Sequence, residues 1–195
     1  MDHRGAKTYI LERLKVGLKK DRTYHSLAHT IDVHAMAIDI GMQEGVQGMD
    51  MELLKTAALY HDSGFLESDK QHEQAGCAIA RRELPRFGYD KASVEKVCDL
   101  IMATKIPQDP KDDLAMVLCD ADLDYLGRSD FHQIGLTLFA EFKAYGVLST
   151  EKEWNLLQVS FLERHRFFTA TNEREREPRK QAHLAALREV VSGYA

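Results

Sequence analysis

The sequence has few cysteines, and their arrangement excludes two classes of small protein. Only Cys77, Cys98 and Cys119 are present in 195 residues. They are odd in number, far apart and flanked by apolar residues at helical spacing, so they fit neither a disulfide framework nor a Cys-x-x-Cys metal knuckle. We expect all three to be reduced core residues, as is usual in a cytoplasmic protein.

Long apolar runs and an excess of positive charge are also missing. No stretch approaches the roughly 18 uninterrupted apolar residues of a membrane span, and no apolar run follows Met1 as in a secretion signal. The formal net charge is -5, whereas a general nucleic-acid-binding surface needs clustered Lys and Arg. We therefore expect a soluble, cytoplasmic protein that binds neither a membrane nor a nucleic acid.

Alternating strand patterns, internal repeats and long linkers are absent from the sequence as well. Apolar residues instead recur at spacings of three and four, which indicates amphipathic helices. A length of 195 residues with 44% hydrophobic content suits one globular domain. The sequence therefore predicts an all-α fold, a single compact bundle of about eight or nine helices over residues 1–195. The expected helices cover residues 5–20, 31–45, 50–60, 72–84, 91–104, 114–126, 129–145, 150–168 and 179–191.

The stretch from Leu53 to Gly64 is the most informative part of the chain. An amphipathic helix, with Asp50 as its expected N-cap, runs directly into His61 and Asp62 and should end at Gly64. Imidazole nitrogen and carboxylate oxygen together suit a divalent cation. Neighbours on an α-helix point about 100° apart, so both side chains reach one ion only where the helix ends or loosens. Two ligands do not complete a site, so the others must come from elsewhere in the chain.

Two other segments carry candidate ligands. His25 and His29 are four residues apart and share one face if both are helical. A later segment is apolar in its first half, which predicts a central helix, and then carries Asp120, Asp122 and Asp124 at alternate positions. On a helix these carboxylates diverge, so at most one or two can face a common point. Acidic groups near a helix C-terminus are electrostatically unfavourable, and a bound ion would relieve that cost.

The order His, His-Asp, Asp in these helical contexts resembles the HD-domain metal-dependent phosphohydrolases. The resemblance runs over residues 24–127, and it implies a motif core onto which C-terminal helices at 129–193 pack. The segments that carry it are Tyr-His-Ser-Leu-Ala-His at 24–29, Ala-Ala-Leu-Tyr-His-Asp-Ser-Gly-Phe at 57–65 and Asp-Ala-Asp-Leu at 120–123.

This resemblance implies a metal site made by His29, His61, Asp62 and Asp122, which would bind one divalent ion. The ion is manganese, iron, cobalt, nickel or zinc, since such a ligand set accepts all of them. Asp122 is preferred because the last ligand of the family usually sits in an Ala-Asp-x-Leu context. Leu123 follows Asp122 directly, so the register is uncertain by two residues and Asp120 stays as the alternative.

The resemblance also implies residues that act on a substrate. His72 opens a His-Glu-Gln segment similar to one that assists proton transfer in nucleotide-cleaving members, although a helix cap would explain it too. His25 is a second candidate, because an imidazole pKa near 6.5 suits general acid–base work. Lys105 and Arg128 are close in sequence to the site-forming segments and are assigned to neutralise phosphate charge. The expected function is metal-assisted hydrolysis of a small phosphate ester, a nucleotide or cyclic nucleotide.

Two alternatives stay open. One is a non-catalytic module that keeps the metal for structure or for sensing a nucleotide. The other is an oxygen-activating di-iron protein of the same fold. Family members with two metals often carry a further histidine after the helix equivalent to residues 91–104. This chain has Thr104-Lys105 there, which favours a single metal.

Overall fold

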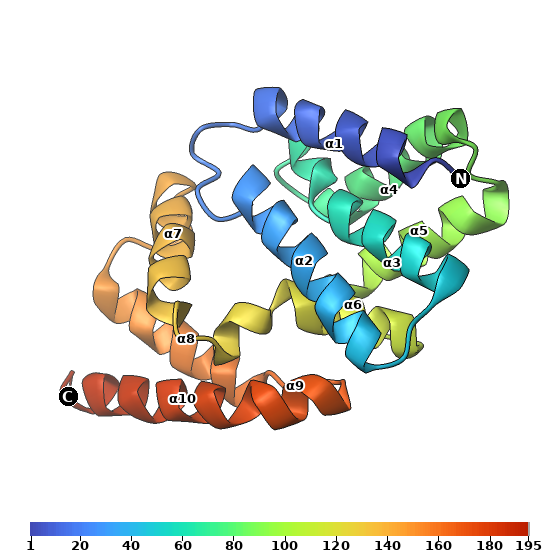
Figure 1. The fold of residues 1–195 in the computed structure, drawn as a ribbon. Helices are drawn as coiled ribbons and strands as arrows, with labels where there is room; N and C mark the ends of the chain where they lie inside the picture. Colours follow the sequence, from blue (N-terminus) through green and yellow to red (C-terminus); the bar gives the residue numbers. More distant parts are fainter. Residues whose placement is uncertain (195) are drawn as a thin grey trace.

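The computed structural model describes residues 1–194, which form ten α-helices and three short 3-10 helices, with no β-strand in that range (Figure 1). The all-α fold predicted from the sequence is confirmed. The α-helices are α1 (His3–Gly17), α2 (Leu27–Gln43), α3 (Gly48–Tyr60), α4 (His72–Glu83), α5 (Lys91–Ala103), α6 (Asp113–Asp122), α7 (Phe131–Ala144), α8 (Glu151–Arg164), α9 (Ala170–Glu175) and α10 (Glu177–Ser192). The 3-10 helices are η1 (Ser63–Leu66), η2 (Leu84–Phe87) and η3 (Asp124–Gly127).

Side-chain caps explain where several helices begin. Ser26 accepts a hydrogen bond from the backbone N–H of His29 and so starts α2 one turn before that histidine. At α8, Thr150 and Glu153 form a reciprocal capping box. Helix α4 ends at Glu83, and a 3-10 turn that contains Pro85 follows.

Three boundaries differ from the sequence-based expectation. Gln47, not Asp50, occupies the cap position of α3, and Asp50 lies in the first helical turn. The eighth helix stops at Arg164 instead of reaching residue 168. The charged stretch that follows contains the separate helix α9, whose N-cap Thr169 accepts from the N–H of Asn172. These ends depend on local capping bonds, which apolar periodicity does not report.

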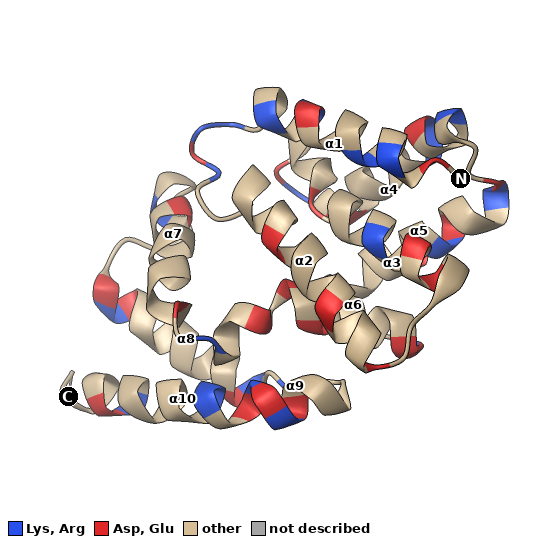
Figure 2. Cartoon of the chain, in the orientation of Figure 1, with Lys and Arg blue, Asp and Glu red and all other residues tan. Residues whose placement is uncertain are grey.

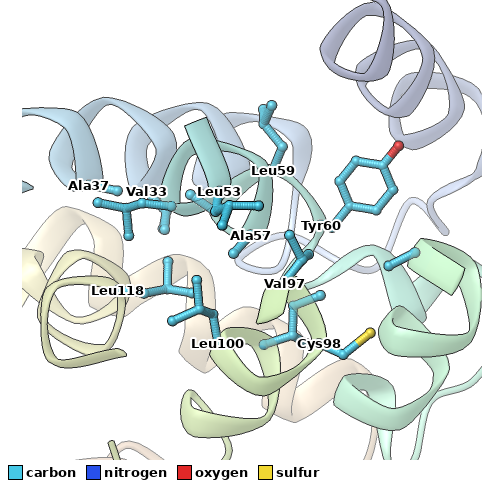
Figure 3. Packing of buried hydrophobic residues seen from close by; sticks show 14 of the residues in the cluster. Val33, Ala37, Leu53, Ala57, Leu59, Tyr60, Val97, Cys98, Leu100 and Leu118 are labelled. Carbon is cyan, nitrogen blue, oxygen red and sulfur yellow. The ribbon is translucent and has the colours of Figure 1, made fainter. Parts of the chain in front are cut away.

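The larger hydrophobic core surrounds α3. Leu54, Ala57 and Ala58 of this helix have no exposed surface, and α2, α5 and α6 pack around them. Figure 3 shows Val33 and Ala37 of α2 beside α3, with Leu100 and Leu118 on the facing helices. Burying one such leucine contributes about 1.5–3 kcal/mol, so this core holds in place the helix end that carries His61 and Asp62.

A smaller, separate core joins the C-terminal helices. Leu126 of η3, Phe131 of α7, Leu162 of α8 and Leu184 of α10 are buried together in it. In Figure 1, α7, α8 and α10 lie at the left and bottom of the view, away from α1, α4 and α5. The contacts between the two groups of helices run through η3, α9 and the segment before α2. This arrangement leaves room for a cavity between the two cores.

Charged side chains of both signs are interspersed on the helices (Figure 2). The Glu and Arg residues of α9 and the start of α10 form one such mixed stretch, as expected for a solvated face. Among the described residues, no helix has the length and apolar character required to cross a membrane. The three cysteines are buried and carry free thiols.

Candidate metal centre

His61 and Asp62 share one direction because the helix loosens between them. Helix α3 ends at Tyr60; His61 keeps helical backbone angles, whereas Asp62 has φ -100° and ψ 3°. This departure from helical geometry lets both side chains turn towards His29 on α2.

Gly64 has a different role from the predicted one. Its φ is not positive, so it does not end the helix through a left-handed conformation. A Cβ atom at Gly64 would overlap the carbonyl oxygen of His72, which no side chain permits. The glycine therefore allows η1 to pack directly on the first turn of α4, and this contact holds His72 next to the His61-Asp62 pair.

Four donor atoms converge at this point. The Nε2 atoms of His29 and His61 are 3.3 Å apart. Asp62 Oδ2 lies 3.4 Å from Nε2 of His29 and 3.2 Å from that of His61. Asp122 Oδ1 lies 3.2 and 3.4 Å from the same two nitrogens. Donors about 2.0–2.1 Å from one tetrahedral centre stand about 3.3 Å apart, so the separations among His29, His61 and Asp122 fit a shared transition-metal ion.

The two carboxylates approach the imidazole pair from different sides. The donor atoms of His29, His61 and Asp122 all lie within 4.8 Å of one another, but Asp62 falls outside that group. Because Asp62 Oδ2 is close to both imidazoles, it must lie on the side of them away from Asp122. Three donors therefore form the tightest cluster. Asp62 lies beside it, close to both imidazoles, and is the fourth candidate ligand.

Hydrogen bonding prepares this cluster for a cation. The Nδ1–H of His61 donates to the carbonyl oxygen of Ala58 at 2.8 Å, which leaves the Nε2 lone pair facing the cluster. Asp62 Oδ2 is buried and has no hydrogen-bond partner. Buried polar atoms are normally satisfied, so an unpaired carboxylate oxygen among converging lone pairs fits a bound divalent ion.

The charges at the centre reinforce one another. Burial alone would lower the pKa of His61, but the nearby Asp62 and Asp122 carboxylates outweigh it and raise that pKa well above its usual value. Burial would raise the pKa of Asp122, yet the neighbouring His29 and His61 imidazoles lower it to about 2. The carboxylates thus stay ionised, as metal ligands must.

The three acids at alternate positions face three different partners. Asp122 faces the imidazoles. Asp120 accepts hydrogen bonds from the backbone of Phe168 and Thr169, and Asp124 accepts from Arg176. Asp122 is therefore the acid of this segment that faces the imidazoles, and the other two carboxylates anchor the segment around α9.

Both histidines assigned to proton transfer lie beside the metal centre. His72 Nε2 is 3.3 Å from Asp62 Oδ1, so Asp62 links His72 to the other donors. The His72 ring stacks on Phe65 with centroids 4.0 Å apart. The His25 ring lies 6.0 Å from that of His72, centroid to centroid. The residues brought together are therefore His29, His61, Asp62, Asp122, His72 and His25.

A buried ion-pair network that the sequence did not reveal holds His25. Glu141 of α7 accepts from the His25 Nδ1–H at 2.5 Å and from the Arg22 guanidinium at 2.6 Å. It also accepts from the backbone N–H groups of Tyr24 and His25. Burial would raise the pKa of Glu141, but these donors outweigh it and lower that pKa to about 2. Because Nδ1 of His25 donates to Glu141, its Nε2 is left for a substrate or water.

One cavity of about 470 Å³ includes Asp62, Asp122, His25 and His72. We call the part formed by these residues and the start of α4 the ligand side. The opposite part, which we call the apolar side, is formed by η3, α7 and α8. Its side chains include Leu126, Phe131, Leu138, Phe142, Trp154, Leu157, Phe161 and Leu162.

The structure separates the two cations assigned to phosphate binding. Lys105 lines the cavity. Arg128 does not; it lies in a second depression with Arg174, Arg176 and Arg179. The Arg128 guanidinium is already paired with Asp32 and Asp130. Closeness in sequence to η3 was not enough to bring this side chain to the metal centre.

Sequence reasoning also missed Phe65 and the apolar side. The HDSGF segment contains Phe65, but its contact with His72 depends on how η1 folds back on α4. The sequence predicts no functional role for the aromatic residues of α7 and α8. Their amphipathic pattern is the same whether they face a core or a cavity, so periodicity does not separate the two cases.

Comparisons with known proteins identify the family of this chain. The HD domain family matches residues 23–124, the segment that carries all four donors. The fold is similar to that of a crystal structure of a predicted HD superfamily hydrolase from an uncultured Thermotogales bacterium. The two chains share 21% identity with a TM-score of 0.63, over 96% of this chain and 92% of the other. No curated protein matches the chain. The matching segment spans about half of the 195 residues, and the chain belongs to the HD domain family.

Proposed function

We propose that this protein is a metal-dependent phosphohydrolase that cleaves a small phosphate ester, with one divalent ion held by His29, His61, Asp62 and Asp122. The observation that carries the proposal is the cluster of His29, His61 and Asp122, with Asp62 3.2–3.4 Å from both imidazoles, beside a cavity that is also lined by two further histidines. The similarity to a predicted hydrolase of the same fold supports it.

A divalent ion at this point supplies Lewis-acid activation of a phosphoryl oxygen and of the attacking water. Water is the only co-substrate that this reaction needs. Water oxygen forms a bond to phosphorus, the ester P–O bond breaks, and the departing alkoxide takes up a proton. The products are the free alcohol and inorganic phosphate. Lys105, which lines the cavity, is placed to neutralise the substrate phosphate.

Some residues around the metal centre position the proton-transfer groups, and others transfer the protons. Asp62 offers one oxygen to the imidazole pair and the other to His72, so it fixes His72 relative to the reacting phosphate. Phe65 restricts the His72 ring to one plane. His72 moves a proton to the leaving group or from the attacking water, and His25, oriented by Glu141, is the second group able to do so.

The test is a variant that loses turnover without losing metal. Wild type is first screened on nucleotides, cyclic nucleotides and simple phosphate esters with manganese, cobalt, nickel or zinc. On the best substrate, His72→Ala should lower kcat by about 10²- to 10⁴-fold, the usual range for general acid–base catalysis, and it should keep the ion. His132→Ala is the matched control, because His132 is an exposed histidine on α7.

Two results would contradict this proposal. If the His72→Ala variant has the kcat of wild type, His72 has no role in catalysis and serves only as the first residue of α4. If no phosphate compound is cleaved with any metal but a nucleotide binds tightly, the protein is a sensing module instead of a hydrolase.

A further inference from the structure

We infer that the substrate is a phosphate monoester whose organic part is apolar, an alkyl or aryl group, and that this group lies against the apolar side of the cavity. The inference rests on the proposed phosphohydrolase function and names its substrate class. It departs from the nucleotide expected from sequence. The inference is based on the continuity of one cavity, which includes Asp62 and Asp122 and is also lined by residues of α7 and α8.

The size of the cavity exceeds what a phosphate group needs. Its volume of about 470 Å³ lies in the range of pockets that enclose whole small molecules, about 300–1,000 Å³. A phosphate bound at the ligand side would therefore leave most of the space to the organic part of the ester. The side chains facing that part include Leu126, Phe131, Phe142, Trp154, Leu157 and Phe161.

Few polar groups on the apolar side remain to recognise a nucleobase. Gln158 is the polar side chain of α8 in the lining, and its amide already donates to Asn155 at 3.2 Å. The Thr104 hydroxyl donates to the carbonyl of Ile101 at 2.8 Å. The ring nitrogens and exocyclic groups of a base would lose water without gaining partners here, which disfavours binding. An alkyl or aryl group has no such desolvation cost.

Aromatic stacking alone does not favour a base over a hydrocarbon. Trp154 is buried, and one face of its ring stacks on Phe139 with centroids 5.7 Å apart. Phe142 meets the same ring edge-on. The tryptophan therefore supplies apolar contact area more than a free stacking platform.

Two apolar side chains of the lining reach the surface. Ile106 is 52% exposed and Leu157 is 37% exposed. They come from different elements, Ile106 just after α5 and Leu157 on α8. Exposed apolar side chains that also line a cavity fit a ligand whose organic part is itself apolar.

The experiment compares substrates that share a phosphate and differ in the organic group. With metal-loaded protein, kcat/KM for hexyl phosphate should exceed that for methyl phosphate by about 100-fold or more and that for AMP by about tenfold or more, since each buried methylene adds to discrimination. Leu157→Gln should reduce kcat/KM for hexyl phosphate by about tenfold, and by less for methyl phosphate. Leu156→Gln is the control, because the neighbouring Leu156 is 45% exposed and does not line the cavity.

Binding of hexylphosphonate, measured by calorimetry, separates the two proposals because its P–C bond is not hydrolysed. If no ester is cleaved but hexylphosphonate binds more tightly than methylphosphonate, and Leu157→Gln abolishes the difference, the hydrolase proposal fails and the ligand class stands. If esters are cleaved but AMP is preferred to hexyl phosphate, the hydrolase stands and the apolar substrate is overturned. Equal effects of Leu157→Gln and Leu156→Gln would also overturn it.

Discussion

The ligand side and the apolar side of the cavity are built in different ways. On the ligand side, polar neighbours set the positions of the functional groups: Ala58 orients His61, Asp62 contacts His72, and each carboxylate lies 3.2–3.4 Å from the imidazoles. On the apolar side, leucine and aromatic side chains are positioned by packing. Chemistry on a phosphate requires atoms placed within tenths of an ångström, whereas holding a hydrocarbon requires volume. Substitutions should therefore be far more costly on the ligand side.

The largest effect, a loss of bound metal, is expected when one of the metal-binding side chains is removed by mutation. Asp122→Ala and His61→Ala should each reduce bound metal from about one ion per chain to near zero, because an incomplete donor set binds weakly. Elemental analysis of purified protein measures this. Asp113→Ala is the matched control, since Asp113 is an exposed acid at the start of the same helix, α6. Equal metal in Asp122→Ala and Asp113→Ala would show that the centre does not bind the ion.

A smaller effect is expected when a side chain is added at Gly64, where η1 packs on α4 beside the ligand side. Gly64→Ala places a Cβ against the backbone carbonyl of His72, so η1 and α4 must separate. We expect a loss of roughly 3 kcal/mol in unfolding free energy, the upper part of the range for overpacking, measured by urea denaturation. Gly135→Ala is the control, because its nearest neighbours, Gln158 and Trp154, are 3.5 Å away and Ala favours the helical interior. Equal losses for both would mean that the contact with His72 is not tight.

The smallest effect concerns Glu141, which joins α7 to the loop before α2. Its pKa is lowered to about 2 in the fold, against about 4.3 in an unfolded chain. A lowered pKa contributes stability above the unfolded value, and this is lost as pH falls from about 4.3 towards 2. Glu141→Gln should cost roughly 2 kcal/mol at pH 7, the scale of hydrogen bonds to charged groups.

The difference between wild type and Glu141→Gln should shrink as the pH approaches 2. Urea unfolding at pH 7 and pH 3 measures this difference. Glu151→Gln is the control, because Glu151 is an exposed acid at the start of α8. A difference that stays constant with pH would mean that Glu141 is not ionised through its partners.

Several features of the ligand side were accessible from sequence because they are local. The approximate positions of all the α-helices except the short α9 follow from apolar spacing, and the His61-Asp62 pair is recognisable at a helix end. The preference for Asp122 over Asp120 came from a sequence context and stays a prediction; in the structure Asp122 faces the imidazoles and Asp120 accepts from the backbone of Phe168. Arg128 shows the limit: closeness in sequence placed it near η3, but its ion pairs with Asp32 and Asp130 direct it elsewhere.

The sequence by itself determined the helical class and the kinds and order of the four donors, because helix periodicity and the motif around His61 depend on neighbouring residues. Only the tertiary structure decided which of the three acids at 120, 122 and 124 faces the imidazoles, which acid orients His25 and what lines the cavity. Glu141 lies 116 residues from His25 in the chain, and the apolar side comes from η3, α7 and α8, outside the helices that carry the donors. Such long-range contacts arise from packing the two cores together, and no local pattern encodes them.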